Sequence, residues 1–67
     1  MLERDPENTD ALNLLGVTAA LCNLPMLAVE LIERAVALRP GNAMYRANLA
    51  RAWRMAGRED EARKYET

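Results

Sequence analysis

The chain has 67 residues, of which 51% are apolar and 4% aromatic, and its 10 acidic and 9 basic side chains give a net charge of −1. With 1 cysteine and no histidine it lacks the residues for an internal disulfide or a usual zinc site, and so short a chain has little volume for a catalytic pocket, so we expect no enzyme, no cofactor and no metal. No apolar run approaches the roughly 20 residues of a membrane span, no signal peptide is evident, and a lone thiol suits a reducing compartment, so we expect a cytoplasmic protein.

Alanine and leucine outnumber the β-branched residues, which favours helices over strands. The periodicity of the first predicted helix is clear from Ala11 to Leu21. Its apolar stripe has helical spacing and comprises Leu12, Leu14, Leu15, Ala19 and Leu21. Asn8 is a suitable N-cap, and Asn23, a residue that tolerates a left-handed backbone, predicts the end of the helix.

A second helix is predicted to begin at Pro25, because proline suits the first helical position. It ends at Arg39-Pro40-Gly41, since the residue before a proline disfavours helix and glycine favours a turn. The positions expected to face inward are Leu27, Ala28, Leu31, Ile32 and Ala35.

Asn42 is placed to cap a third helix, which is predicted from Ala43 to Ala56 and is followed by Gly57. Its inward positions are Leu49, Ala50, Trp53 and Ala56. A fourth helix is predicted to begin near Arg58 or Glu59 and to run to Thr67, and the short connections predict antiparallel neighbours.

Related residues recur 34 positions apart. Asp5-Pro6-Glu7-Asn8 corresponds to Arg39-Pro40-Gly41-Asn42, and the same offset joins Leu15 to Leu49, Asn23 to Gly57, and Ala28 to Ala62. A period of this length with paired helices is typical of a helical repeat protein.

The residues at these positions resemble the tetratricopeptide (TPR) repeat. One unit reads Leu12, Leu15-Gly16, Ala19, Ala28, Ile32, Ala35 and Pro40, and the next reads Leu49-Ala50, Trp53, Gly57 and Ala62. The resemblance implies an all-α fold of two antiparallel hairpins in a short right-handed α-solenoid. Residues 1–8 would be the tail of a preceding repeat, 9–42 unit one, and 43–67 an incomplete unit two of a longer array. Small side chains at Gly16, Ala28 and Ala50 would allow close helix contacts.

The second unit departs from the pattern at two positions. Arg46 stands at its first large position, where we expect Tyr45 to fill the space instead, and Glu66 stands where unit one has Ile32, beside the apolar Tyr65. The leucine- and alanine-rich style is similar to bacterial O-GlcNAc-transferase-like TPR arrays. In those arrays an asparagine before the leucine binds peptide backbone, and Asn48 matches it.

The resemblance implies a non-catalytic protein–protein interaction module. The first helix of each unit would line a groove for a protein or peptide ligand, in which arginines pair with carboxylates and methionines adapt to varied side chains. The implied groove residues are Asp10, Asn13, Val17, Leu21, Met44, Asn48, Arg51, Arg54 and Met55.

Other interpretations remain open from the sequence. The groove positions could form a solvated face without a ligand, the chain could be a small stand-alone adaptor that self-associates, and Arg51, Arg54 and Arg58 could form a surface for anionic ligands or RNA. Trp53 is interpreted as a core residue, and Cys22 as a small buried hydrophobe at a helix end.

The two halves of the chain have opposite charge. Residues 1–33 hold six acidic and one basic side chain, a net charge of −5, and residues 34–67 hold eight basic and four acidic ones, a net charge of +4. The first hairpin should also expose apolar side chains, namely Leu14, Leu24, Met26 and Leu27. We therefore predict a homo-oligomer, formed by end stacking or by helix swapping through the turns at Asn23–Pro25 or Pro40–Gly41.

Overall fold

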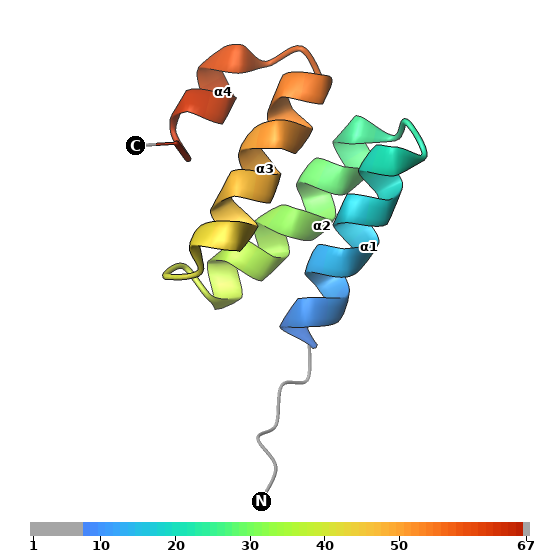
Figure 1. Ribbon diagram of the computed structural model, residues 1–67. Coiled ribbons are helices and arrows are strands. Elements are labelled where there is room, and N and C mark those ends of the chain that lie inside the picture. The colour runs from blue at the N-terminus through green and yellow to red at the C-terminus, as the bar shows by residue number, and fades with distance from the viewer. Residues whose placement is uncertain (1–7, 67) are drawn as a thin grey trace, which may run out of the picture.

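The computed structural model describes residues 8–66, and over this range the chain is helical without strands, as the all-α prediction states. The helices are α1 (Thr9–Leu21), α2 (Pro25–Leu38), α3 (Ala43–Met55) and α4 (Glu59–Arg63). Successive helices lie side by side and run in opposite directions (Figure 1). In addition α1 contacts α3, so these two helices lie next to one another although α2 separates them in the sequence.

Both ends of α1 are fixed by asparagines that the sequence predicts for these roles. The Asn8 side chain accepts a hydrogen bond of 3.3 Å from the Ala11 amide, and its own backbone is left-handed, with φ 48°. At the other end Asn23 has φ 64°, and the Leu24 amide donates to the Ala19 carbonyl at 2.9 Å. This double turn, a Schellman motif, satisfies carbonyls that the helix leaves open.

The ends of α3 repeat this chemistry one repeat period further along the chain. The Asn42 side chain accepts from the Tyr45 amide at 3.0 Å. Gly57 has φ 81°, and the Arg58 amide donates to the Trp53 carbonyl at 2.9 Å. The correspondence of Asn8 with Asn42 and of Asn23 with Gly57 is therefore structural as well as a pattern in the sequence.

The core is built from small side chains that let helix backbones approach closely. A Cβ added to Gly16 would lie 2.3 Å from Ile32 Cγ1 and 3.2 Å from the Ala28 carbonyl oxygen, so only glycine fits there. The predicted close contacts at Gly16 and Ala28 are confirmed, and Ala50 is buried too. The buried apolar residues are Leu12, Ala19, Ala28, Val29, Ile32, Ala35, Tyr45, Leu49, Ala50, Ala52 and Ala62.

The aromatic residues behave as predicted. Tyr45 is buried against Leu12 and Ala35, so it fills the space left by Arg46. Trp53 and Tyr65 are partly buried and pack on the cluster that contains Leu49.

Several predictions about burial are wrong. Leu15 is 55% exposed and Leu27 44%, because nothing in the described chain covers these sides of α1 and α2. Leu14 and Leu21 are exposed as well and do not widen the buried stripe. The prediction that the first hairpin exposes Leu14, Leu24, Met26 and Leu27 is confirmed. Cys22 is exposed because it is the C-cap of α1, at the rim of the turn.

Two helix ends also differ from the prediction. α3 ends at Met55, with Ala56 as its C-cap, and α4 ends at Arg63 instead of running to Thr67, which lies outside the described residues. The chain turns at residues 64–66, where Glu66 reaches back to Arg54 on α3. The predictions for residues 1–7 likewise fall outside the described range.

Candidate functional site

A groove with a volume of about 150 Å³ lies between α1 and α3. Its lining residues are Val17, Ala20, Leu21, Ile32, Asn48, Arg51, Ala52 and Met55. Ile32 and Ala52 are buried and form the floor, while Leu21, 83% exposed, and Met55, 49% exposed, stand at the rim. The lining is therefore mostly apolar, with one amide and one guanidinium.

Five of the nine predicted site residues line this groove: Val17, Leu21, Asn48, Arg51 and Met55. They meet because α1 and α3 lie side by side. Ala20, Ile32 and Ala52 belong to the groove as well and were not predicted as site residues. The sequence carries no signal for them, because an apolar residue at the bottom of a groove looks the same in the sequence as any other core residue.

Asn13, a further predicted residue, does not line the groove but forms a hydrogen bond with the lining residue Asn48. The Asn48 Nδ2 group donates a hydrogen bond of 3.1 Å to Asn13 Oδ1. The second N–H and the carbonyl oxygen of the Asn48 amide have no partner within residues 8–66. An amide in this state can donate and accept once more, which is what recognition of a peptide backbone requires.

Asp10 and Met44 are not brought into the groove. The Asp10 carboxylate accepts a hydrogen bond from the hydroxyl of the buried Tyr45, so it links α1 to α3 near their N-terminal ends. Met44 is exposed and lines neither of the two hollows described here.

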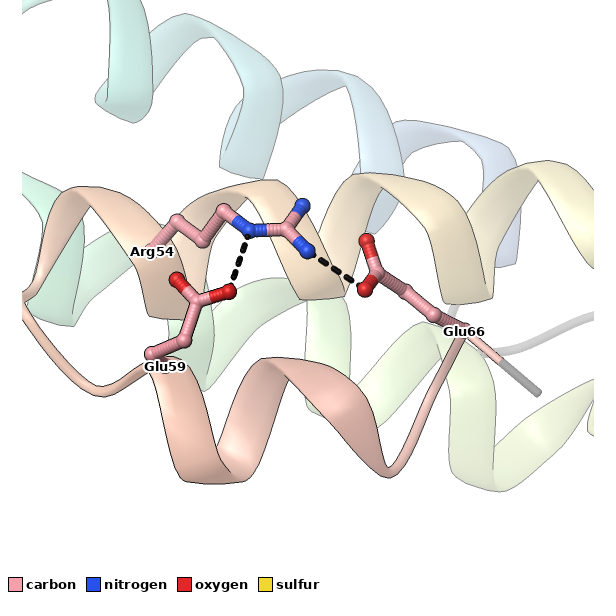
Figure 2. Close-up of polar contacts among 3 residues, drawn as sticks. All are labelled: Arg54, Glu59 and Glu66. Carbon is pink, nitrogen blue, oxygen red and sulfur yellow. Dashed lines mark hydrogen bonds and ion pairs between the residues drawn. The ribbon is translucent and has the colours of Figure 1, made fainter.

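Arg54 is directed away from the groove, toward the C-terminal turn. Figure 2 shows its guanidinium between two carboxylates: Nε donates to Glu59 Oε2 at 3.1 Å, and Nη2 donates to Glu66 Oε1. The hydrogen bond to Glu66, followed by that to Glu59, raises the pKa of Arg54. Arg54 therefore connects α3 to both ends of the last segment.

Arg58 is paired locally as well. Its Nε lies 3.7 Å from Asp60 Oδ1, its Nη2 lies 3.8 Å from Glu61 Oε2, and its guanidinium carbon lies 5.8 Å from the Trp53 ring centre. Of the three arginines Arg51, Arg54 and Arg58, only Arg51 has no ion pair or hydrogen bond from its side chain to another part of the described chain. The groove thus contains the least compensated charge of the three.

A second, wider hollow of about 700 Å³ lies between α3 and the C-terminal turn. It is lined by Ala43, Arg46, Ala47, Arg51, Arg54, Tyr65 and Glu66. Arg51 therefore stands between the two hollows and is accessible from both.

Neither a metal-binding cluster nor a membrane-spanning helix is found in the described part of the chain. No group of three or more acidic, cysteine or histidine side chains there is arranged to hold a metal ion. None of its helices has the length and apolar character needed to cross a membrane.

Comparison with known proteins gives no match: no protein-family model, no curated protein and no solved structure is significantly similar to this chain. The geometry of the groove and the repeat in the sequence are therefore the basis for assigning a function.

Proposed function

We propose that the chain is a non-catalytic protein–protein interaction module of the TPR type, in which the two hairpins belong to a right-handed α-solenoid. The matching N-caps and matching Schellman turns at equivalent positions of the two units support this proposal, as does the close contact at Gly16. In this interpretation residues 9–42 and 43–67 are successive units of an array, and the module acts in the cytoplasm.

The ligand we propose is an extended peptide that carries an apolar side chain next to a carboxylate. The observation that supports it best is the groove itself, in which Arg51 and Asn48 stand among Val17, Leu21 and Met55. The guanidinium would pair with the carboxylate, the free edge of the amide would bind the peptide backbone, and the flexible methionine would adapt to the apolar side chain.

Selection from a random peptide library, followed by affinity measurement on the selected peptides, tests this function. Arg51→Ala and Asn48→Ala should each weaken binding by about tenfold, which corresponds to the loss of one charge-assisted or neutral hydrogen-bonded contact. Arg63→Ala is the matched control, because Arg63 is an exposed arginine outside the groove. If all selected peptides bind both groove variants as well as the control variant, the groove is not the site.

The anionic-ligand and RNA interpretation has less support. Arg54 and Arg58 are paired with carboxylates inside the chain, so a phosphate would have to compete with Glu59, Glu66, Asp60 and Glu61. Arg51 alone offers little of the salt-dependent affinity that nucleic-acid binding requires.

A further inference from the structure

We propose that copies of this chain associate head to tail, with the exposed side of α1 around Leu14 and Leu15 packed into the hollow between α3 and the C-terminal turn of the next copy. This proposal gives the predicted self-association its contact surfaces. It does not depend on peptide binding, because it rests on how the two units of one chain already pack, although Arg51 lines both the groove and this hollow.

The first step is the side of α3 that packs on the first hairpin. That side includes Leu49, Ala52 and Tyr45, which are 0%, 1% and 4% exposed. The equivalent residues one repeat period earlier are Leu15, Thr18 and Ala11, of which Leu15 is 55% exposed and Thr18 is also exposed. The same side of the equivalent helix is thus covered in α3 and bare in α1.

Leu14 adds to the difference in exposure between α1 and α3. Its equivalent is Asn48, which is half-buried and hydrogen-bonded to Asn13, whereas Leu14 is an apolar side chain that is 64% exposed. Two adjacent leucines in water at a position that the second unit buries are a surface suited to a partner.

The second step is the surface that receives α3. On the first hairpin it includes Asn13, Val17, Ala20 and Ile32, which lie against α3 or line the groove beside it. Their equivalents one repeat period later are Ala47, Arg51, Arg54 and Glu66. All four line the wide hollow of about 700 Å³, so the equivalent positions lie open. Three of them carry charged side chains where the first hairpin has apolar ones.

The chain therefore leaves open the positions equivalent to both sides of an interface that it forms internally. If a second copy places its α1 in the hollow, that helix packs on α3 of the first copy in the same way as α3 packs on α1 within one chain. Leu14 of one copy would then contact the region of Ala47 of the other, as Asn48 contacts Asn13 within the chain.

The charges favour the same arrangement. The helices α1 and α2 contain three acidic side chains, Asp10, Glu30 and Glu33, and one basic one, Arg34, while the hollow contains three arginines and one glutamate. Opposite fields at the two ends of one chain attract in a head-to-tail contact and repel in a head-to-head contact. A second copy is accordingly the occupant to which this surface is matched.

A head-to-tail contact does not close on itself, so it produces an open series of dimers, trimers and longer stacks. Helix swapping would instead give a closed dimer in which Leu14 and Leu15 stay exposed. The two arrangements therefore differ in their mass distribution and in their dependence on these leucines.

Sedimentation velocity on the full chain, from about 1 μM to about 1 mM, is the first test because it covers the affinity range of small interfaces. We expect a concentration-dependent series of species that weakens with added salt. The double variant Leu14→Glu with Leu15→Glu should weaken association by about tenfold or more, while its circular dichroism stays helical because both side chains are exposed.

Met26→Glu is the matched control. Met26 is 57% exposed, similar to Leu15, and its equivalent in the second unit is Asp60, an exposed acidic residue. This variant should associate as the parent chain does. A monomer at every concentration, a closed dimer, or equal weakening by the control and the double variant would overturn the proposal.

Crosslinking tests the register. With Cys22→Ser to remove the exposed native thiol, we would prepare the single variants Leu14→Cys and Ala47→Cys and treat them with a short bismaleimide. The mixture of the two variants should give crosslinked dimers, and each variant alone should give none. A dimer from Leu14→Cys alone would indicate a two-fold interface and refute the head-to-tail arrangement.

Discussion

The side-chain amide of Asn48 on α3 donates a hydrogen bond of 3.1 Å to the amide oxygen of Asn13 on α1. The bond joins two helices that are separated in the sequence by all of α2. Asn48 also lines the groove, so one residue takes part in helix packing and in the surface proposed for recognition.

We expect this bond to stabilise the fold measurably. In a double-mutant cycle, Asn13→Ala and Asn48→Ala should show a coupling energy of about 0.5–1.5 kcal/mol, the usual net value of a part-buried hydrogen bond. Urea unfolding of the four proteins gives the number. A cycle between Asn13 and Arg63, which have no contact in the described chain, should give zero coupling within error, and an equal value in both cycles would contradict the prediction.

Gly16→Ala should destabilise the chain although alanine is the better helix former. The added methyl group would lie 2.3 Å from Ile32 Cγ1, and such overpacking costs about 1–3 kcal/mol. Gly41→Ala is the control, because a Cβ there meets no atom within 4 Å, and it should change the unfolding free energy by less than about 0.5 kcal/mol. Thermal unfolding that ranks the two variants equally would show that the contact at Gly16 can relax.

Gly57 should tolerate asparagine better than alanine. Its φ of 81° lies in the left-handed region, where a Cβ costs about 1–2 kcal/mol but asparagine is partly compensated. Asn23 already occupies the equivalent position with φ 64°. Unfolding free energies in the order glycine, asparagine, alanine are expected, and a stability of Gly57→Ala equal to that of the parent chain would be inconsistent with the left-handed turn.

Arg54 should hold the C-terminal turn on α3. Its pKa is raised by hydrogen bonds to Glu66 and Glu59, and a basic group with a raised pKa contributes stability that is complete below its unfolded pKa and is lost only as the pH rises through the folded value. Since both values lie above the range of ordinary buffers, the contact should be unchanged between about pH 7 and about pH 10.

Hydrogen exchange can measure this contact. Arg54→Ala should speed exchange of the Tyr65 amide, which is bonded to the Ala62 carbonyl in the C-terminal turn, and should leave the α1 amides unchanged. Arg63→Ala removes an exposed arginine from the same region and serves as the control. High salt should reduce the difference between the two variants, because the paired side chains are partly exposed, 39% for Arg54 and 37% for Glu66.

The Cys22 thiol should react with a maleimide in the native chain at a rate close to that of a free peptide thiol. The residue is exposed at the C-cap of α1, so no unfolding is needed for access. A rate that rises only in denaturant would place this residue in the interior after all.

The turns and the closest helix contact could be predicted from the sequence because each depends on one residue type. Asn8, Asn23, Pro25 and Gly57 have few alternatives to the roles they take, and Gly16 has a spacing that indicates a close approach. Groove residues such as Val17 and Arg51 followed from the TPR resemblance, since periodicity alone does not say which exposed side meets a neighbour.

Burial on α1 could not be predicted in the same way. Leu15 and Leu12 are alike in the sequence, but only Leu12 faces α2, and Leu15 is left in water because nothing in the described chain covers that side. The partners of Arg54 depend on where the chain turns after Arg63, a boundary that the helical pattern of the last residues did not reveal.

The contact between α1 and α3 has a consequence for cooperativity. Each helix contacts its neighbour in sequence, and the contact between α1 and α3 is the only one among the described helices that skips a helix. The last helix, α4, contacts α3 alone among the described helices. Contacts of such short range favour fast folding and let the C-terminal end open without unfolding the first hairpin. A peptide bound to Val17 on one wall and Arg51 on the other would join both hairpins, and would make them unfold as one unit.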